Sequence, residues 1–450
     1  MTIDLSTNIT FTNQADVVPV SGWDPIVNTG IANTLDGDDK ITGLGGPFSI
    51  YNPTPGSRGE GITNSGTLNT GEGNDIIYGK ANVNGIVNTG TFNTAEGNDI
   101  ISAWGGYYYG ISNSGTLNTG EGNDIINSHG VGAGIDNSGT FNTGNGDDVI
   151  TGSGTKSVGI DIRSGSTFDT GNGNDRISGN GTIGIANASM TFNTGDGNDT
   201  IEGSGSGYYT IENKGHINTG NGKDTIITDG VTSYGAGGLA NFSTIDTGNG
   251  EDRITVSGRI NNEGTIYTGD GDDIITAGNF DNKGIIDTAG GDDIITTGNF
   301  SNYGTINTGN GNDSIIVAQM SMIGTGCTLN TDDGNDIITS NNNIRNEGTI
   351  NTGNGADFII ANGGFSGMGS VFLGNGKDYL NGFGTGNFNG GNNQDTLELT
   401  SGSYTVGISG ATVSFTKSGV TMITSEFEKL IAGSTTHNFT SLSQGQTIVV

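Results

Sequence analysis

The chain has 450 residues, of which 86 are Gly and only 5 are Pro, and its 47 acidic residues against 15 Lys and Arg give a net charge of −32. Acidity this strong excludes nucleic acid as a default partner and favours cations. Only 30% of the residues are apolar, which in an irregular chain would indicate disorder. One short motif, however, recurs in strict order along nearly the whole chain.

Residues 1–30 contain no copy of this motif, and apolar residues alternate around Ile3, Leu5, Ile9 and Phe11. We expect one or two strands that cap the first repeat. The segment has no basic start and no apolar core, so it does not predict a Sec signal peptide. No run anywhere is long and apolar enough to predict a membrane span.

The motif is clearest in residues 69–77, Asn-Thr-Gly-Glu-Gly-Asn-Asp-Ile-Ile, and sixteen copies align on their last Asp. The copies lie 24–28 residues apart from Asp75 to Asp252, and 20–23 apart from there to Asp378. A repeat of this length is typical of a solenoid, in which each repeat forms one coil. The aligned residues are Asp39, Asp75, Asp99, Asp124, Asp148, Asp175, Asp199, Asp224, Asp252, Asp273, Asp293, Asp313, Asp336, Asp357, Asp378 and Asp395.

Three positions in each repeat are apolar: two residues after the Asp, seven before it and thirteen before it. Because the residues beside them vary freely, each position indicates a strand with one buried face. We therefore predict an all-β fold, a parallel three-sided β-solenoid of about 15 coils. The column thirteen residues before the Asp is Ile62, Ile86, Ile111, Ile135, Ile162, Ala186 (with Ile185 beside it), Ile211, Leu239, Ile260, Phe280, Phe300, Ile323, Ile344 and Phe365.

Two polar columns accompany the apolar ones. One is an Asn two residues after the apolar position that lies thirteen before the Asp, and the other is a Thr five residues before the Asp. We expect both to point inward and to hydrogen-bond from coil to coil, as buried polar groups must. We assign all length variation to one edge, between the strand after the Asp and the next coil. The longest insertions there are residues 42–60 and 228–238. Several aromatic residues lie on this edge and are candidates for binding a ligand: Trp104, Tyr107, Tyr108, Tyr109, Tyr208 and Tyr209.

The motif ends near Gln394, and residues 395–450 alternate in short strand patterns such as Tyr404–Ile408 and Val420–Ile423. The sequence thus predicts an N-terminal cap (1–30), a solenoid (31–394) and a small C-terminal β domain (395–450).

The loop itself reads Gly-x-Gly-x-Asp. Glycine allows a positive φ, so the backbone can turn its carbonyls to one side. Carbonyl and carboxylate oxygens are the ligands of Ca²⁺, and two loops one coil apart could supply enough of them. A tight corner stabilised by Asp is the alternative. The candidate metal ligands are Gly71, Gly73, Asp75, Gly97, Asp99, Gly120, Gly122, Asp124, Gly144, Gly146, Asp148, Gly171, Gly173, Asp175, Gly195, Gly197, Asp199, Gly220, Gly222, Asp224, Gly248, Gly250, Asp252, Gly269, Gly271, Asp273, Gly291, Asp293, Gly309, Gly311, Asp313, Gly334, Asp336, Gly353, Gly355, Asp357, Gly374, Gly376 and Asp378.

The run Thr70-Gly71-Glu72-Gly73-Asn74-Asp75-Ile76-Ile77 resembles the haemolysin-type (RTX) calcium-binding repeat from that repeat's second glycine onward. The resemblance implies Ca²⁺ held between adjacent turns by Gly carbonyls and Asp. Two departures stand out: Thr replaces the first glycine, and one motif rather than two falls in each coil. We therefore expect a single calcium column, and a chain that folds on binding Ca²⁺.

The C-terminal run Asp395-Thr396-Leu397-Glu398-Leu399, with Phe427-Glu428-Lys429-Leu430, resembles the end domain of type I-secreted RTX proteins. This resemblance implies a bacterial protein exported without an N-terminal signal to the cell surface or exterior. An ordinary β cap is the alternative. The single Cys327 permits no intramolecular disulfide, which suits either a cytoplasmic protein or a secreted bacterial protein stabilised by metal.

No catalytic set is evident, because the three His are scattered at His129, His216 and His437. We therefore expect no enzyme; a polysaccharide lyase or epimerase is the alternative of that class. The main expectation is an extracellular structural, surface-layer or adhesive protein that binds itself or a cell-surface polysaccharide. A third possibility is ice or lattice binding by an outward Thr-x-Asn face. That face comprises Thr67/Asn69, Thr116/Asn118, Thr140/Asn142, Thr305/Asn307 and Thr349/Asn351.

Overall fold

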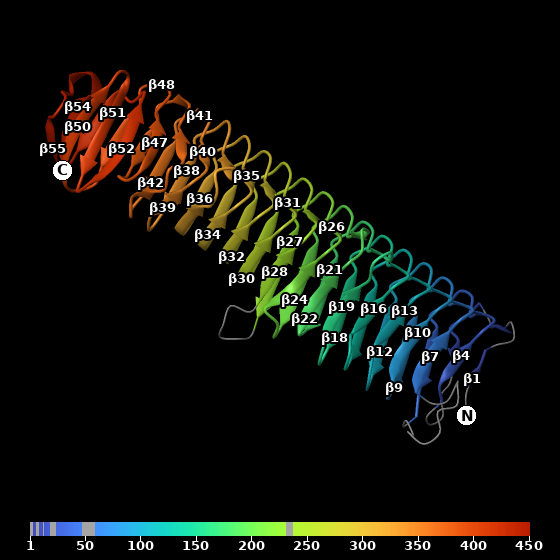
Figure 1. Cartoon of the computed structure of the whole chain (residues 1–450). Coiled ribbons are helices and arrows are strands. Elements are labelled where there is room, and N and C mark those ends of the chain that lie inside the picture. Colours follow the sequence, from blue (N-terminus) through green and yellow to red (C-terminus); the bar gives the residue numbers. More distant parts are fainter. Residues whose placement is uncertain (1–2, 6–8, 12, 19–23, 47–58, 231–236) are drawn as a thin grey trace. The chain divides into compact units, whose positions relative to one another are not determined.

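A computed structural model describes residues 3–5, 9–11, 13–18, 24–46, 59–230 and 237–450 of the chain (Figure 1). It is an all-β parallel solenoid of about 14 turns, which confirms the predicted fold class. The chain divides into two compact units, Met1–Gly248 with Thr255–Gly258, and Asn249–Ile254 with Arg259–Val450. Most of the two long insertions, residues 47–58 and 231–236, lies outside the described residues.

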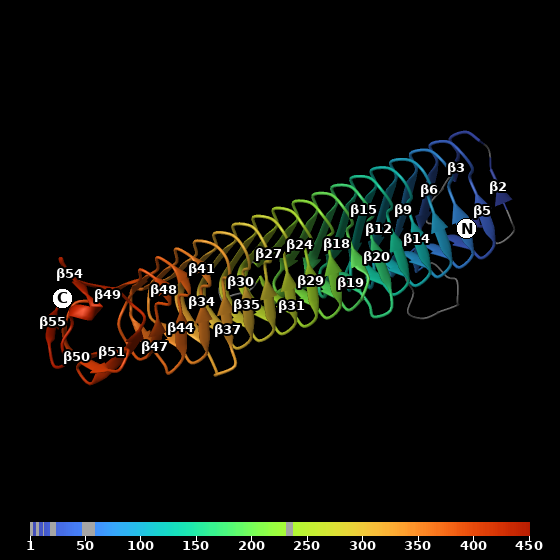
Figure 2. The ribbon, with the colours of Figure 1, turned by 90° about the horizontal axis from the view of Figure 1, so that it is seen from above.

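One coil shows how the sequence pattern becomes structure. Strand β12 (Ile100–Gly105) follows the Asp99 loop, β13 (Ile111–Asn113) follows the insertion, and β14 (Thr116–Asn118) leads to the next loop. Each strand pairs in parallel with its equivalent one coil later, as in Ile101 with Ile126 and Leu117 with Phe141. Figure 2 shows the successive coils within each unit.

The strands form two main sheets, here called sheet A and sheet B. Sheet A contains both the strand after the loop and the strand after the insertion, and sheet B contains the short strand before the next loop. In some coils of the second unit, the two sheet A strands are a single strand, as in β34 (Ile294–Asn302). The three apolar columns are therefore present, and two of them belong to one sheet.

In the first unit, the remaining sheet A strands after the loops are β3 (Val17–Val18), β6 (Lys40–Leu44), β9 (Ile76–Ala81), β15 (Ile125–Gly130), β18 (Val149–Gly154), β21 (Arg176–Gly181), β24 (Thr200–Gly205) and β27 (Thr225–Gly230). The sheet A strands after the insertions are β1 (Ile3–Asp4), β4 (Ile26–Asn28), β7 (Glu60–Asn64), β10 (Asn84–Asn88), β16 (Ile135–Asn137), β19 (Val158–Ile162), β22 (Ile183–Asn187), β25 (Tyr209–Asn213) and β28 (Gly238–Asn241). Sheet B contains β2 (Ile9–Thr10), β5 (Ile31–Asn33), β8 (Thr67–Asn69), β11 (Thr91–Asn93), β17 (Thr140–Asn142), β20 (Thr167–Asp169), β23 (Phe192–Asn193), β26 (His216–Asn218) and β29 (Thr244–Asp246).

Strand β30 (Arg253–Asn262) contributes residues to both units. In the second unit, sheet A continues with β32 (Ile274–Asn282), β36 (Ser314–Met322), β38 (Ile337–Ser340), β39 (Ile344–Asn346), β42 (Phe358–Ala361), β43 (Phe365–Ser366), β46 (Tyr379–Asn381) and β49 (Thr396–Leu399). Its sheet B contains β31 (Thr265–Tyr267), β33 (Ile285–Asp287), β35 (Thr305–Asn307), β37 (Thr328–Asn330), β40 (Thr349–Asn351), β44 (Ser370–Phe372) and β47 (Gly386–Asn389). Three loops also pair as β41 (Asn354–Gly355), β45 (Asn375–Gly376) and β48 (Asn392–Asn393).

The C-terminal residues combine both kinds of pairing. Strands β52 (Val420–Ser425) and β53 (Lys429–Ala432) extend the two sheets in parallel, on β47 and β49 respectively. The others are antiparallel: β50 (Ser403–Ser409), β51 (Thr412–Lys417), β54 (Thr435–Asn438) and β55 (Thr447–Val449). The three-residue 3-10 helix Phe439–Ser441 also lies here, and no described helix is long and apolar enough to cross a membrane.

The predicted apolar columns form the core, with three corrections of register. The residue aligned with Ile135 is Ile160 rather than Ile162, and the residue aligned with Ile344 is Met320 rather than Ile323. The residue aligned with Ile211 is Ile185 rather than its neighbour Ala186. The cause is that length also varies at the turn from sheet A to sheet B. This step spans six residues from Ile62 to Leu68, but eight from Ile160 to Phe168 and nine from Met320 to Leu329. The assignment of all length variation to one edge was therefore wrong.

The inward polar columns are present as hydrogen-bonded ladders. Asn64 Nδ2 donates to Asn88 Oδ1 over 2.8 Å, and Asn88 Nδ2 to Asn113 Oδ1 over 2.8 Å. Thr94 Oγ1 donates to the Thr119 carbonyl of the next coil over 3.0 Å. These ladders give the buried amides and hydroxyls partners in the neighbouring coil, so the polar columns are structural.

Candidate functional site

The Gly-x-Gly-x-Asp loops have the backbone that their sequence predicts. Gly71 and Gly73 have φ of 88° and 139°. Where the first glycine is replaced, the substitute still takes a positive φ, as in Ala95 at 69° and Asp332 at 58°. The loop shape is therefore kept even at a cost in backbone strain, because L side chains disfavour this region.

Close stacking of the loops requires glycine at the second position. A Cβ on Gly97 would lie 1.8 Å from the carbonyl oxygen of Gly73, one coil earlier. The same relation holds for Gly146 and the Gly122 carbonyl, at 1.9 Å. The glycine carbonyls of one loop thus face the next loop, where a side chain would collide with them.

The Asp residues of the loops form a buried column joined by hydrogen bonds. The Asp75 N–H donates to Oδ1 of Asp99 over 2.8 Å, and the Asp99 N–H donates to Oδ1 of Asp124 over 2.8 Å. Each carboxylate therefore holds the backbone of the coil before it. The sequence predicts these Asp as metal ligands or corner caps and does not predict this ladder.

The residue just before each Asp makes a second ladder in the opposite direction. The Asn98 N–H donates to Asn74 Oδ1 over 2.8 Å, and the Asn123 N–H donates to Asn98 Oδ1 over 2.7 Å. These side chains are exposed. The recurrence of Asn and Asp at this position was the sequence signal for the ladder.

The second oxygen of the buried carboxylates lacks a partner. Among the described loops, Oδ2 is buried without a hydrogen bond in fourteen aspartates, from Asp39 to Asp199 and from Asp273 to Asp395. The hydroxyl of Thr70 lies beside the carboxyl of Asp75, but it donates to the Thr94 carbonyl over 3.4 Å. A buried, unpartnered carboxylate oxygen is costly, so this position favours a proton or a cation as its partner.

The electrostatics of the column agree with that conclusion. Burial raises the pKa of Asp75 to about 7, although the nearby Thr70 hydroxyl and the Asp39 backbone N–H lower it. Burial likewise raises the pKa of Asp148 to about 8, and the neighbouring Asp175 and Asp124 carboxylates raise it further. A bound divalent cation would reverse this by favouring the ionised form.

The residues present fit a hard cation. No group of three or more His, Cys, Asp or Glu side chains that could hold a metal exists in the described part of the chain. A cation in the column would therefore need backbone carbonyls as well as carboxylates, and the glycine carbonyls face the next loop. An all-oxygen donor set of this kind is suited to Ca²⁺.

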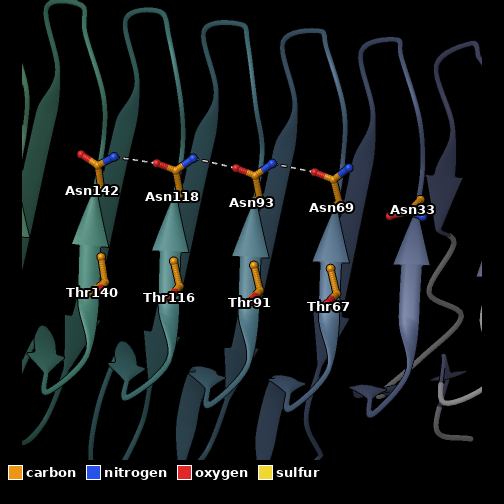
Figure 3. A pocket seen from close by; sticks show the side chains of 9 residues that line it. All are labelled: Asn33, Thr67, Asn69, Thr91, Asn93, Thr116, Asn118, Thr140 and Asn142. Carbon is orange, nitrogen blue, oxygen red and sulfur yellow. Dashed lines mark hydrogen bonds between the residues drawn. The ribbon is translucent and has the colours of Figure 1, made fainter.

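A second regular surface lies on the outer face of sheet B (Figure 3), called here the Thr/Asn face: Thr67, Thr91, Thr116 and Thr140 with Asn69, Asn93, Asn118 and Asn142. The strands pair without any shift in register, so Thr lies beside Thr and Asn beside Asn. The Asn form a ladder in which Asn93 Nδ2 donates to Asn69 Oδ1 over 2.7 Å. Together with Asn33, these residues line a shallow hollow of about 400 Å³.

The predicted aromatic edge does not form one cluster. Trp104 lies on sheet A and stacks on His129, with ring centroids 6.2 Å apart and planes 10° apart. Tyr107, Tyr108 and Tyr109 contact one another in the insertion that follows, and Tyr208 contacts Tyr209 in another coil. The partners of Trp104, Lys80 and His129, were missed, although each lies one repeat away in the sequence.

No family model and no curated protein matches the sequence. Among solved structures, the chain is similar to a hyperactive, Ca²⁺-dependent, β-helical antifreeze protein from an Antarctic bacterium. The sequences are 16% identical, the match covers 84% of this chain and 83% of that one, and the TM-score is 0.32. At this level the match carries no functional argument, so the function has to be argued from the loops and faces of this chain.

Proposed function

We propose that this chain is a calcium-stabilised extracellular solenoid that binds ice through the Thr/Asn face of sheet B. The observation that carries the proposal is the register of that face: identical Thr-x-Asn pairs repeat on four consecutive strands (Figure 3). Neighbouring strands lie about 4.7–4.9 Å apart, and residues i and i+2 lie about 6.6–6.8 Å apart along a strand. Such an array matches a partner that is itself periodic in two directions.

The side chains of the Thr/Asn face distinguish between three periodic partners: a mineral, a crystalline polysaccharide and ice. Its eight residues carry no charge, although the chain carries −32. A mineral lattice of ions would call for charged side chains. A crystalline polysaccharide would call for aromatic side chains, and this face has none. Threonine hydroxyl and methyl groups, with amides held in one orientation by their ladder, suit an uncharged lattice of water.

Calcium has a supporting role in this proposal. Flatness depends on every coil keeping the same register, and the loops set that register at the edge that follows sheet B. Asn69 of the face precedes Gly71 of the loop by two residues. Ca²⁺ held by the Asp column and the glycine carbonyls would fix the loops and hence the spacing of the face. Export to a calcium-rich exterior by the type I route belongs to the same proposal.

Thermal hysteresis and ice-affinity partitioning of the calcium-saturated full-length protein would test it. We expect activity that Thr116→Tyr removes, because a large ring breaks the flat face while Tyr remains favourable in a strand. Thr200→Tyr is the matched control, because Thr200 lies on the outer face of sheet A in β24. An inactive folded wild type, or equal loss in both variants, would reject ice binding.

A structural role through self-association is a second candidate, supported by a different surface. On sheet A of the second unit, one outward column runs through Ile294, Ser314, Ile337 and Phe358, and its three apolar residues are 37%, 40% and 41% exposed. Exposed apolar columns of this kind mark interaction surfaces. Sedimentation with and without Ca²⁺ measures assembly, and Ile337→Lys should abolish it.

A further inference from the structure

The outer face of sheet A in the first unit contains a groove that ice binding does not use. Tyr78, Ser102 and Asn127 form one wall on neighbouring strands, and Trp104 and His129 form the other. Its volume is about 350 Å³. Because β9, β12, β15 and β18 pair without a shift, the groove crosses several strands at right angles to the chain.

The aromatic wall is ordered by contacts between neighbouring strands. The Trp104 ring is stacked on His129 with a plane angle of 10°, and the Lys80 ammonium lies 5.0 Å from its centroid. Gly106 packs against the same ring, since a Cβ there would lie 3.2 Å from it. The ring is therefore held in one orientation, yet 37% of Trp104 is exposed. Trp is enriched among the side chains that contribute most of the energy at binding interfaces.

The polar wall determines which ligand this groove would recognise. Ser102, Asn127 and Thr151 present hydroxyl and amide groups that both donate and accept hydrogen bonds. No carboxylate lines the groove, although 47 of the 450 residues are acidic. The groove is thus unsuited to cations, and the charge of −32 on the chain disfavours polyanions.

We propose that this groove binds a neutral glycan chain. Sugars offer C–H faces that pack on aromatic rings and hydroxyls that pair with neutral polar side chains, which is the combination present here. The open ends of the groove accommodate a polymer rather than a single sugar. Lys80 and His129 flank the Trp104 ring from the coils before and after, so the exposed edge of Trp104, together with Tyr78, contacts the C–H groups. Ser102, Asn127 and Thr151 bind the hydroxyls.

This inference is independent of the proposed ice binding, because the two surfaces lie on different sheets. It also assigns the glycan contact to β9, β12, β15 and β18, rather than to the inserted tyrosines. Tyr107 and Tyr108 are exposed by 69% and 54%, but neither lines the groove.

A panel of neutral and acidic polysaccharides, titrated into calcium-saturated full-length protein and measured by calorimetry, tests the inference. The chain contains two Trp, so Trp23→Phe leaves Trp104 as the only indole reporter of ligand contact. We expect a neutral polysaccharide to bind and to change that fluorescence. Trp104→Ala should weaken binding by at least about tenfold, as for a central aromatic contact, and Trp104→Phe should restore part of it.

Tyr107→Ala is the matched control, because it removes an exposed aromatic residue of the same coil and should leave the affinity unchanged. Circular dichroism verifies that each variant keeps its strand content. Binding only to acidic polysaccharides, no binding by folded wild type, or equal loss in Trp104→Ala and Tyr107→Ala would overturn the proposal. Thermal hysteresis of Trp104→Ala should equal that of the wild type, so failure of either proposal can be told from failure of the other.

Discussion

The Asp124 N–H donates to Oδ1 of Asp148 over 2.8 Å, so the carboxyl group of one coil holds the backbone of the coil before it. Oδ2 of Asp148 is buried and has no partner. The two oxygens of one carboxylate therefore have different roles: one completes the backbone ladder, and the other is available to a cation. A substitution that separates these roles would test the calcium column directly.

Asp148→Asn is that substitution. The amide oxygen can still accept from the Asp124 N–H, but the negative charge and the free carboxylate oxygen are lost. In EGTA, we expect the variant to be at least as stable as the wild type, because it buries no charge. In excess Ca²⁺, we expect the calcium-dependent rise in the free energy of unfolding to shrink by about 1–3 kcal/mol, the scale of contacts to a buried charged group.

Asp147→Asn is the control for this measurement. It removes the same charge from the next residue, which is exposed and accepts hydrogen bonds from Asn174. We expect little change in the calcium response. A calcium-dependent rise in melting temperature that is the same in both variants and the wild type would exclude the Asp column as the metal site.

The metal-free protein should be more stable in mild acid than at neutral pH. Burial raises the pKa of Asp75 and Asp99 to about 7 and that of Asp199 to about 8, above the ordinary value of 3.8. Between these values the folded chain binds more protons than the unfolded chain, so the free energy of unfolding falls as the pH rises. In EGTA, we expect the melting temperature to be higher at pH 5 than at pH 8.

Calcium should invert this dependence, because cation and proton compete for the same carboxylates. In excess Ca²⁺, the melting temperature should rise from pH 5 to pH 8. A melting temperature that falls with pH to the same extent in calcium and in EGTA would contradict calcium binding by these residues.

Close stacking of the loops can be tested at Gly146, where φ is 142° and a Cβ would lie 1.9 Å from the Gly122 carbonyl. Gly146→Ala forces neighbouring loops apart, and we expect a loss of more than about 3 kcal/mol in the free energy of unfolding, as for severe overpacking. Gly165→Ala is the control, since φ there is 79° but nothing lies within 4 Å. It should cost only about 1 kcal/mol, from backbone strain. Denaturant unfolding in Ca²⁺ compares the two, and equal losses would show that strain rather than stacking requires glycine.

The sequence predicted what is periodic and failed where the period changes. Fixed apolar positions identified the buried columns because every coil repeats them. Ile162 was misplaced because two additional residues lie after the column, and the sequence does not show at which corner a longer repeat takes them up. Ile162 instead occupies the position of the inward Asn, beside Asn137.

The sequence predicted which residues form the candidate site, but it did not predict the hydrogen bonds between them. Gly71, Gly73 and Asp75 could be singled out because the conformational freedom of glycine and the oxygens of Asp have few other uses in a repeated loop. The assignment of Oδ1 to a backbone N–H depends on the offset between adjacent coils, which no single repeat contains. The Lys80, Trp104 and His129 contacts depend on the same offset, and the even spacing of 24 and 25 residues was their only signal in the sequence.

Core truncation in one coil should have a local effect, because each coil of a solenoid contacts mainly its neighbours. Phe141 is fully buried and its ring centroid lies 4.8 Å from that of Phe168. We expect Phe141→Ala to cost about 3–5 kcal/mol, and Phe141→Leu to cost less than about 1.5 kcal/mol, because Leu117 occupies the same column one coil earlier. Hydrogen exchange in Ca²⁺ should show faster exchange in β14, β17 and β20, whereas amides in β35 and β37 should keep their protection. Uniform loss of protection along both units would mean that the chain unfolds as one cooperative body rather than coil by coil.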